Sequence, residues 1–346
     1  MFNRIKKEID KELPRFLKET DRLYHLSRIS PLLSKSIYDF VLRDGKRVRP
    51  ILFIIGYKGF AKKTAANLYR SALAIELLHD FMLVHDDIID KSETRRGKPS
   101  MHALLNKHLR HYKKIKFNGQ DLSIVVGDVM YAMAINAFLS INENFARKEK
   151  ALKKFIEAAA YTGTGEFIEL LSGALPIQTT TKQDINKIYD YKTARYTFST
   201  PLVTGAILAG ASDRQADRLF QFGIYLGRAF QIKDDILGIF GDEKKIGKST
   251  LSDLQEAKKT LLIWHAYHSG NTHTKALIKK VFSKKRVMKN DCLAIRRVIE
   301  EAGTLKYCRK EIKTLSQKAL SLLAAINMHS LYKNALRDYS QEILHT

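Results

Sequence analysis

Apolar residues recur along most of the chain at spacings of three and four positions, which is the period of one face of an α-helix. One such row contains Leu305, Cys308, Ile312 and Leu315. The same spacing marks the segments 65–92, 121–142, 148–173, 183–210, 213–241 and 303–326. The strict alternation that is typical of half-buried strands is scarce. The pattern therefore predicts an all-α protein.

Two segments between these helices carry turn signals instead of the helical period. The segment 111–121 contains an Asn-Gly pair, and the segment 172–184 is broken by a glycine and a proline. We expect both to be loops. Since no internal repeat and no low-complexity linker divides the chain, we expect one large helical domain over residues 1–346.

Composition points to an ordinary globular protein. Of the 346 residues, 45% are hydrophobic and 28% are charged, as in soluble domains. We expect no segment long enough to span a bilayer and no signal peptide, because the first residues mix both charges. Cys292 and Cys308 show neither disulfide nor metal-site spacing, so we expect reduced thiols and a cytoplasmic protein.

The formal net charge of +24 implies affinity for anions such as phosphates, nucleic acid or an anionic membrane face. A lysine-rich solvated surface would give the same total, so the charge alone decides little. The basic segment 111–121 is interpreted as a solvated loop, with contact to a membrane surface as the alternative. We expect no nucleic acid partner and at most peripheral membrane contact.

Four aspartates lie close together in "LLHDFMLVHDDIID" (77–90). On a helix, Asp86 and Asp90 face the same way, with Asp87 beside them. Like charges at this spacing repel one another unless a cation lies between them. Oxygen ligands without clustered His or Cys suit Mg²⁺, which completes its shell with water and substrate phosphates. A solvated acidic face is the alternative, but the flanking residues are too apolar for it.

A second acidic pair, Asp234 and Asp235, lies in "FQIKDDILGIFGD" (230–242). Basic groups accompany both clusters: "RDGKRVRP" (43–50), "RRGK" (95–98), Lys192 and "KKIGKSTLSDLQEAKKT" (244–260). Arginine forks and lysine ammonium groups bind phosphate. Acidic and basic clusters together predict a site for metal-bridged polyphosphate.

In this order, "GKRVRP", "HDDIIDKSETRRGKPSMH", "YKTARYTFSTPL" and "FQIKDDILGIFGD", followed by "GKS" and "DLQEAKKT", resemble the motifs of the trans-isoprenyl diphosphate synthases, the polyprenyl synthetase family. The resemblance implies a homodimer of helical domains, each with a deep central cavity. It also implies a Mg²⁺-dependent prenyltransferase that condenses isopentenyl diphosphate head-to-tail with an allylic diphosphate.

The resemblance also implies roles for individual residues. Three Mg²⁺ ions are expected, two held by Asp86 and Asp90 and one by Asp234, with Asp87 and Asp235 in support. The allylic diphosphate is expected to lie against Arg95, Lys192, Lys248 and Lys258, and the isopentenyl diphosphate against Lys46, Arg49, His79 and Arg96. Thr193 and Gln231 are expected to face the developing cation.

Product length is expected to depend on the residues four and five positions before the first aspartate of the motif, Met82 and Phe81. One aromatic ring and one methionine there point to geranylgeranyl diphosphate, with twenty carbons. The alternatives are farnesyl diphosphate, or products of twenty-five carbons and above. A floor formed by Tyr131 or Met133 on the following helix also stays open.

The chain departs from the family pattern at several points. Gly238 stands where many members have a third aspartate, and Asp242 lies a further turn along. The usual Gly-Gln-x-x-Asp signature reads Gly165-Glu166-x-x-Glu169. The first motif begins Asp-Gly, where Gly-Gly is common. Lys258 and Lys259 compete for one role, and register favours Lys258.

Three other classes of protein fit the sequence less well. A terpene cyclase normally lacks "GKRVRP". A di-iron helical bundle needs paired Glu-x-x-His motifs, which Glu76…His79 and Glu342…His345 match in spacing without explaining the phosphate-binding cations. A nonenzymatic nucleic acid-binding protein explains the net charge but not the inward aspartates.

Overall fold

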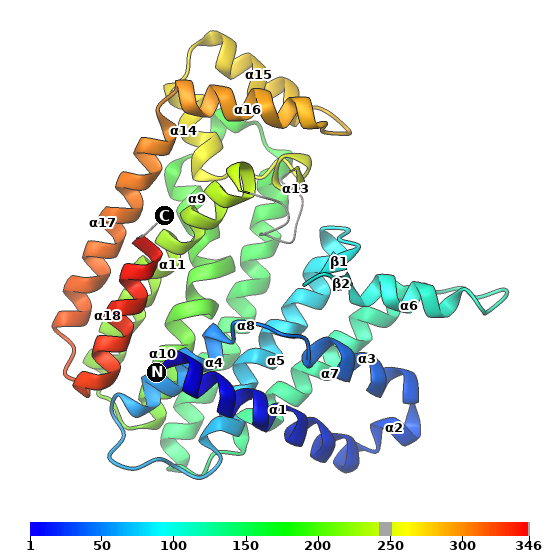
Figure 1. The fold of residues 1–346 in the computed structure, drawn as a ribbon, viewed down its shortest axis with the longest axis vertical. Helices are drawn as coiled ribbons and strands as arrows, with labels where there is room; N and C mark the ends of the chain where they lie inside the picture. Colours follow the sequence, from blue (N-terminus) through cyan, green and yellow to red (C-terminus); the bar gives the residue numbers. More distant parts are fainter. Residues whose placement is uncertain (242–250, 345–346) are drawn as a thin grey trace. The chain divides into compact units, whose positions relative to one another are not determined.

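The computed structural model describes residues 1–241 and 251–344 (Figure 1). The chain is helical nearly throughout, which confirms the all-α prediction. It divides into two compact units: unit 1 is Met1–Leu152 with Thr204–Gly210, and unit 2 is Lys153–Val203 with Ala211–Thr346.

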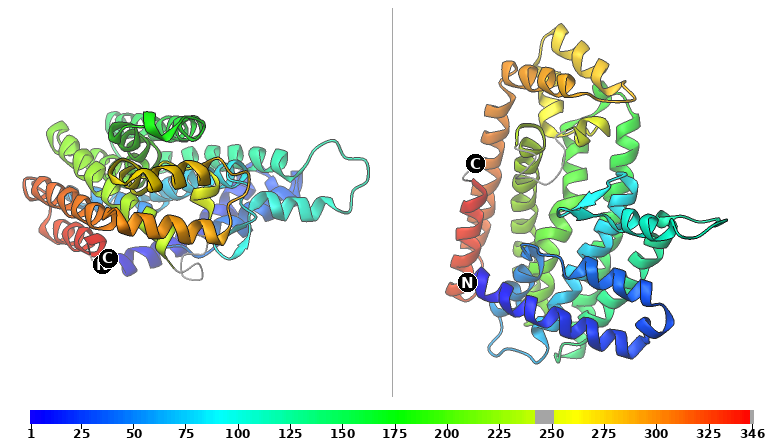
Figure 2. Two further views of the ribbon diagram at one scale, coloured as in Figure 1. Left: turned by 90° about the horizontal axis from the view of Figure 1, so that it is seen from above. Right: turned by 45° about the vertical axis from the view of Figure 1, so that its right-hand side comes forward.

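Unit 1 contains the helices of the first half of the chain and a short hairpin (Figures 1 and 2). Its elements are α1 (Phe2–Tyr24), α2 (Leu26–Ile29), α3 (Pro31–Val41), α4 (Val48–Lys58), α5 (Leu68–Ile89), β1 (Thr94–Arg95), β2 (Lys98–Pro99), α6 (Met101–Leu109) and α7 (Gly119–Leu139). Helix α8 (Phe145–Ala174) begins in unit 1 and continues into unit 2, and α10 (Thr200–Leu208) also has residues in both.

Helix α5 is the core helix of unit 1. It packs along α7 and also against α1 and α4, and most of its residues from Leu68 to Asp80 are buried. Local sequence fixes where its neighbours begin. Ser30 caps α3 ahead of Pro31, and Asn118 and Asp121 form a capping box at the start of α7. Such caps satisfy backbone N–H groups that have no partner within the helix.

The expectation that no segment is long enough to span a bilayer is wrong for α7. This helix has 21 residues, and an 18-residue window within it has a mean hydropathy of 1.8, so its length and composition alone would allow it to cross a membrane. However, 44% of that window is buried, and α7 packs against both α5 and α6. Packing of this kind is that of a core helix.

Unit 2 contains the remaining helices. They are η1 (Ile177–Thr179), α9 (Lys182–Ile188), η2 (Tyr189–Ser199), α11 (Asp213–Phe240), α13 (Ser252–Gln255), α14 (Leu261–Ser269), α15 (Thr272–Phe282), α16 (Lys289–Glu301), α17 (Thr304–Ala324) and α18 (Ser330–Leu344). Helix α11 packs along both η2 and α17.

Element η2 is a π-helix, which the sequence pattern did not predict. The predicted helix 183–210 is in fact α9, η2 and α10 in one continuous run. Pro201 offers no N–H to the carbonyl of Thr197, so an α-helical ladder cannot run unbroken from η2 into α10. π-helical turns often occur at functional sites, and η2 contains Lys192 and Thr193.

The β1–β2 hairpin was not predicted either. Thr94 pairs with Pro99 and Arg95 with Lys98, and the two-residue turn between them is Arg96-Gly97. Both turn residues have positive φ, 54° and 72°, as a type I′ turn requires. This turn fixes the position of two arginines that the sequence assigned to different substrates.

Candidate functional site

The aspartates of unit 1 cluster at the C-terminal end of α5. Asp86 is half-buried in the last turn, and Asp90 is the C-cap residue. A carboxylate oxygen of Asp86 lies within 4.8 Å of one of Asp90. The predicted sharing of one helix face is confirmed, and the two groups offer only oxygen donors, the kind that Mg²⁺ prefers.

Asp87 has a different environment from its two neighbours. It is fully buried and accepts hydrogen bonds from Nε of Arg95, at 2.8 Å, and from Nη2 of the same side chain. Burial raises the pKa of this carboxyl, while the guanidinium of Arg95 lowers it. Asp87 therefore orients Arg95 from behind, which fits the supporting role expected for it.

Two further carboxylates lie on the buried face of α5, one turn apart. Glu76 accepts a hydrogen bond of 2.6 Å from Nη1 of Arg47. Asp80 lies 3.6 Å from Nη2 of Arg96, and both carboxylates are almost fully buried. Burial raises the pKa of Asp80 well above its usual value, as does the charge of Glu76. These residues hold the arginines of the "GKRVRP" and "RRGK" motifs against α5.

Sequence reasoning assigned no role to Arg47 or Asp80, and it read Glu76 only as part of a di-iron alternative. The structure assigns Glu76 to a buried ion pair with Arg47, which also contacts Asp10 at 3.1 Å. His345 of the second Glu-x-x-His match lies outside the described residues. An Asp four residues after a Glu on an apolar helix face was the available signal, because buried carboxylates need cationic partners.

The residues predicted to hold isopentenyl diphosphate form a basic region of unit 1. His79 is half-buried on α5, and its pKa is held well below the usual value by burial and then by the charges of Arg49 and Arg96. Both effects favour the neutral imidazole. Lys46 is exposed in the loop before α4. An anion placed here would meet several positive charges.

The structure also shows the surroundings of Asp44 and Gly45, with which the first basic motif begins. A Cβ atom on Gly45 would lie 3.5 Å from Cζ of Arg96, in ordinary contact, so this loop and the hairpin turn touch. Asp44 itself is exposed and binds Lys6 at 3.2 Å. The unusual aspartate therefore points to a surface lysine.

The predicted product floor is an aromatic cluster between α5 and α7. The Phe81 ring lies 5.2 Å from that of Tyr131 and 4.7 Å from that of His85, between centroids. A Cβ atom on Gly127 would come within 2.4 Å of His85 and 3.3 Å of Phe81, so glycine makes room for both rings. Phe81 and Tyr131 are therefore in contact, so the two alternatives predicted for the floor are not independent. His85, read as structural, lies 3.2 Å from the carbonyl of Ile124.

In unit 2, Lys192 lies between two carboxylates of α8. Its Nζ atom is 2.6 Å from Glu166 and 2.5 Å from Glu169. The family signature would place a neutral amide and a shorter carboxylate at these two positions. Here the ammonium faces two negative charges instead of one.

Thr193 and Gln231, which were predicted to face the same cation, are hydrogen-bonded to each other. The Thr193 hydroxyl donates to Oε1 of Gln231 at 2.7 Å. The amide of Gln231 in turn donates to Oδ1 of Asp235 at 2.9 Å, and the hydroxyl of Tyr189 donates to the other oxygen of Asp235. The chain of bonds fixes the orientation of each polar group on this face of α11.

Asp234 and Asp235 have contrasting surroundings. Asp234 is half-exposed, whereas Asp235 is buried. Burial raises the pKa of Asp235 to about 8, although its hydrogen bonds from Tyr189 and Gln231 lower it. Direct ligation by Asp234 with Asp235 behind it stays a prediction, and the burial favours that division.

Gly238, where the family often has a third aspartate, lies against Asp253 of α13. A Cβ atom on Gly238 would lie 2.6 Å from Oδ2 of Asp253. A larger residue at 238 would therefore displace this carboxylate, which occupies the space beside the missing side chain.

The competing lysines after α13 differ in environment. Lys259 is buried and donates to the carbonyl of Ser172, and burial lowers its pKa. Lys258 is half-buried and pairs with Glu256 at 2.6 Å. This contrast supports Lys258 as the phosphate ligand. Lys248 and Asp242 lie outside the described residues.

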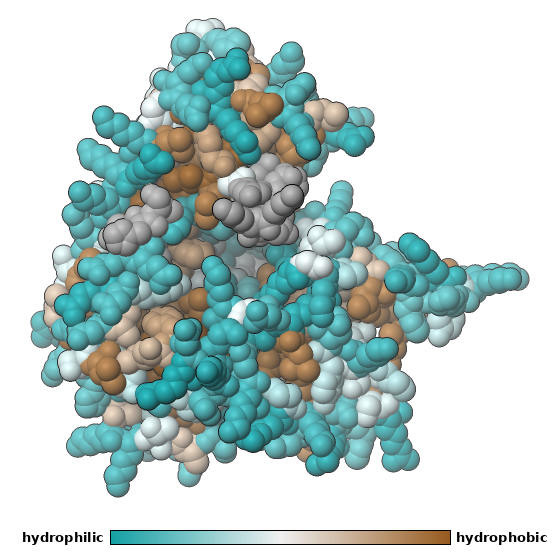
Figure 3. All heavy atoms as spheres, in the orientation of Figure 1, coloured by the Kyte–Doolittle hydropathy of each residue, from teal (hydrophilic) through white to brown (hydrophobic). Residues whose placement is uncertain are grey.

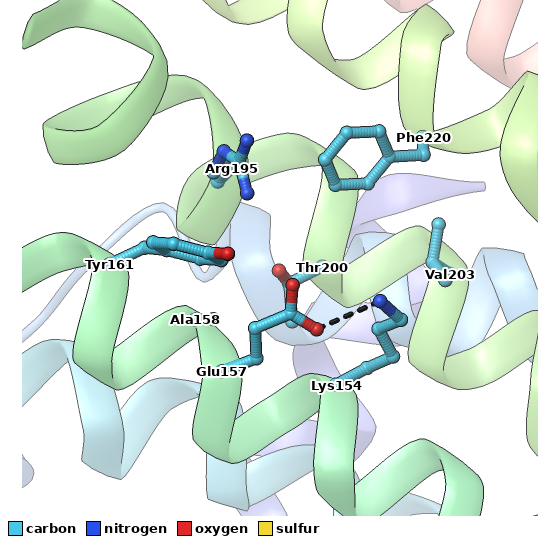
Figure 4. A pocket seen from close by; sticks show the side chains of 8 residues that line it. All are labelled: Lys154, Glu157, Ala158, Tyr161, Arg195, Thr200, Val203 and Phe220. Atoms are coloured by element: carbon cyan, nitrogen blue, oxygen red, sulfur yellow. Dashed lines mark hydrogen bonds and ion pairs between the residues drawn. The ribbon is translucent and has the colours of Figure 1, made fainter. Parts of the chain in front are cut away.

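A small pocket of unit 2 lies beside η2 and is lined by Tyr161, Arg195 and Phe220, among others (Figure 4). The guanidinium of Arg195 lies over the rings of Tyr161, Tyr191 and Phe220, at 4.3, 4.6 and 5.4 Å from their centroids. Stacking of a cation on aromatic faces is stabilising. We interpret these stacked side chains as packing that stabilises η2, the helix that contains Lys192.

The chain is similar to known proteins over most of its length. Residues 30–299 match the family model described as polyprenyl synthetase. A geranylgeranyl diphosphate synthase of Sulfolobus acidocaldarius is 30% identical over 85% of this chain and 86% of its own length. An octaprenyl diphosphate synthase of Escherichia coli is 29% identical over 85% and 84%.

Solved structures share the fold. A geranylgeranyl pyrophosphate synthetase of Pyrococcus horikoshii has a TM-score of 0.81 at 26% identity and covers 100% of this chain and 98% of its own. A geranylgeranyl pyrophosphate synthase of Corynebacterium glutamicum, solved with isoprenyl diphosphate and magnesium, has a TM-score of 0.89 at 24% identity and covers 100% and 99%. At 24% identity, the similarity to the Corynebacterium glutamicum structure shows a shared fold only.

Proposed function

The chain belongs to the polyprenyl synthetase family, and on this premise we propose that it is a trans-isoprenyl diphosphate synthase whose main product is geranylgeranyl diphosphate. The C–O bond of an allylic diphosphate breaks and diphosphate leaves. The terminal alkene carbon of isopentenyl diphosphate bonds to the allylic cation. A proton is then lost to the departed diphosphate, and the chain is five carbons longer.

One observation carries this proposal. Asp86 and Asp90 present oxygen donors one helical turn apart, and Arg95 is fixed beside them by Asp87. A structural acidic face would not hold an arginine fork next to two carboxylates that repel each other. The arrangement suits a diphosphate that is bound through both metal and guanidinium.

The donor set fits a divalent metal, with Asp86, Asp90 and Asp234 as ligands for three Mg²⁺ ions. When bound, the metal neutralises the charge that develops on the departing diphosphate. Arg95, Lys192 and Lys258 bind and orient the same diphosphate. Lys46, Arg49, His79 and Arg96 hold isopentenyl diphosphate, and Lys248 is assigned to the allylic site by its motif.

Polar groups of unit 2 stabilise the positive charge that develops on the reacting carbon. The Thr193 hydroxyl already donates to Gln231, so its oxygen lone pairs are free to face a cation. The carboxamide oxygen of Gln231 carries a partial negative charge, which also stabilises a nearby cation. Stabilisation by such preoriented dipoles costs no reorganisation during the reaction.

The contact between Phe81 and Tyr131 supports the twenty-carbon product over longer ones. Phe81 lies about one and a half turns before Asp86, or roughly 7.5 Å along the axis of α5, and forms an aromatic barrier with Tyr131 of α7. Met82 is adjacent and more easily displaced. A barrier at that depth stops the growing tail early, whereas an octaprenyl product needs an open path.

A homodimer is part of the proposal. Exposed apolar side chains form a row along α8, which contains Ile156, Phe167, Leu170 and Leu171. Rows of large apolar groups on a surface mark interaction sites, and a second copy of this chain is the partner that the family suggests. Phe167→Glu should produce monomers in analytical ultracentrifugation.

We also assign the protein to the cytoplasm, where the buried thiols of Cys292 and Cys308 stay reduced. Residues 1–346 are proposed to act as one catalytic domain. The family match at 30–299 runs through both compact units, which supports a single functional body.

Calorimetric titration with an unreactive thio analogue of farnesyl diphosphate tests the proposed site. Binding by the native protein should require Mg²⁺, and Asp86→Ala should weaken it by about tenfold or more. The matched control is Asp217→Ala, which removes an exposed carboxylate of α11. Equal affinity with and without Mg²⁺ would refute the metal-bridged site.

A further inference from the structure

The connection between α6 and α7, residues 110–118, projects beyond the ends of the two helices that it joins (Figures 1 and 2). Every residue of this 110–118 loop is exposed. No part of the proposed reaction uses it. Its composition and its attachment to α6 and α7 are nevertheless typical of a binding surface.

The loop combines positive charge with exposed apolar groups. Its cations are Arg110, Lys113, Lys114 and Lys116, and its large apolar side chains are Tyr112, Ile115 and Phe117, which are 58%, 37% and 47% exposed. No acidic residue occurs between Glu93 and Asp121. The polar colouring of this projection is visible in Figure 3.

The lysines of the loop carry charge that no described carboxylate neutralises. In the part of the chain that the structure describes, no carboxylate pairs with Lys113, Lys114 or Lys116. Their charges repel one another across a few residues, which costs free energy unless an anionic partner is present. The loop therefore keeps an unbalanced positive potential at its tip.

The base of the loop is fixed, although its tip makes few contacts. The backbone N–H of Gly119 donates to Oδ1 of Asn106 at 2.7 Å, and Asn118 and Asp121 close the capping box of α7. A Cβ atom on Gly119 would lie 2.4 Å from the carbonyl oxygen of His102. Only glycine permits α6 and α7 to approach so closely here, so the tip is carried on a rigid stem.

We propose that the 110–118 loop docks the protein on an anionic lipid surface. Lysine and arginine contact lipid phosphates and carboxylates, while Tyr112, Ile115 and Phe117 enter the boundary between headgroups and acyl chains. Aromatic and basic groups on one short projection are the combination that interfacial anchors use. Each cation near an anionic membrane favours binding about fivefold.

A lipid surface fits the loop better than nucleic acid does. Single-stranded nucleic acid is bound in concave, positively charged grooves whose aromatic faces stack on bases. This loop is a projecting tip, and its central apolar residue, Ile115, has no ring to stack and no group to hydrogen-bond. A prenyl diphosphate with a twenty-carbon tail partitions into lipid, so docking would also bring the enzyme to its product. This reason rests on the proposed function.

Vesicle flotation of the full-length protein tests the proposal. The vesicles are phosphatidylcholine alone, or phosphatidylcholine with about 30% phosphatidylserine, at low and high salt. The native protein should float only with the anionic vesicles and should be released by salt. Lys113→Ala/Lys114→Ala/Lys116→Ala should weaken binding by about 100-fold, from three fivefold steps.

The matched control removes equal charge elsewhere. Lys306, Lys310 and Lys313 are exposed on α17, with no large apolar side chain exposed among them. Their triple alanine variant should change binding less than threefold. If both triple variants lose binding equally, net charge alone is responsible and the docking loop is refuted.

A second variant tests insertion separately from charge. Tyr112→Ser/Phe117→Ser keeps every lysine and should lower vesicle binding about tenfold. Neither loop variant should change turnover with soluble substrates, so loss of docking and failure of the proposed catalysis are distinguishable. Unchanged vesicle binding, or binding to single-stranded RNA but not to vesicles, would overturn the proposal.

Discussion

Helix α8 and the π-helix η2 touch backbone to backbone at Gly165 and Lys192. A Cβ atom on Gly165 would lie 2.5 Å from the backbone nitrogen of Lys192 and 2.9 Å from its Cα atom. Backbone atoms cannot move aside as the end of a flexible side chain can. The glycine therefore sets the distance between the carboxylates of α8 and the ammonium group that they hold.

Gly165→Ala should displace η2 and lower kcat/KM by about 10- to 100-fold, because small misplacements of catalytic groups are costly. It should also cost about 1–3 kcal/mol of unfolding free energy from overpacking. Gly163→Ala is the matched control, since a Cβ atom there meets open space. The control should keep full activity and gain slightly in stability. Full activity in Gly165→Ala would show that this contact does not position Lys192.

Arg49→Ala should separate the two diphosphate sites. Removing this cation should raise KM for isopentenyl diphosphate at least about tenfold, as loss of a charge-assisted contact does. The KM for the allylic substrate, measured in the same reactions, serves as the internal control and should change by less than about twofold. A similar rise for both substrates would mean that Arg49 does not belong to one site.

Phe81→Ala should lengthen the product by at least one five-carbon unit, because the ring forms half of the barrier with Tyr131. Chromatography of the dephosphorylated products measures the shift. Tyr131→Phe, which keeps the second ring, is the control and should leave the distribution unchanged. If Phe81→Ala retains activity and makes the same product as the native protein, the floor lies elsewhere.

The stability of the protein should depend on the ionisation of Asp235. The pKa of this carboxyl is about 8 in the folded protein and near its usual value of about 4 when unfolded. Between these values the folded state binds the proton and the unfolded state does not. The contribution of Asp235 to stability is therefore lost as pH rises from about 4 to 8.

Asp235→Asn removes this titration while keeping the shape of the side chain. Urea unfolding in Mg²⁺-free buffer should show that the variant gains on the native protein as pH rises, by at most about 1.4 kcal/mol per pH unit. Above pH 8 the difference should stop growing. A constant difference from pH 4 to 8 would contradict a proton held on Asp235.

The sequence predicted those features that depend on local periodicity and on motif spacing. Asp86 and Asp90 share a helix face because a four-residue spacing on any helix places them there. The same is true of the long helices, whose apolar rows repeat with the helical period. Thr193 and Gln231 were grouped through the family resemblance, and the structure brings them within hydrogen-bonding distance.

What the sequence could not predict depends on contacts between distant segments. The pairing of Arg96 with Asp80 requires the hairpin turn to reach α5, and the site of Asp253 against Gly238 requires α13 to fold back on α11. The π-helix η2 was also missed, since hydrophobic spacing hardly distinguishes a π-helix from an α-helix. Each of these is tertiary information that no local pattern contains.

The most direct test of the proposed function is the turnover of labelled isopentenyl diphosphate by the purified protein. Farnesyl, geranyl and dimethylallyl diphosphates serve as primers in separate reactions with Mg²⁺, and the products are dephosphorylated and separated by chromatography. We predict label in a twenty-carbon prenyl alcohol, none after chelation of the metal, and about a thousandfold less with Asp86→Ala. Absence of a labelled prenyl product from every primer, or conversion of the primer alone to a cyclic hydrocarbon, would contradict the assignment.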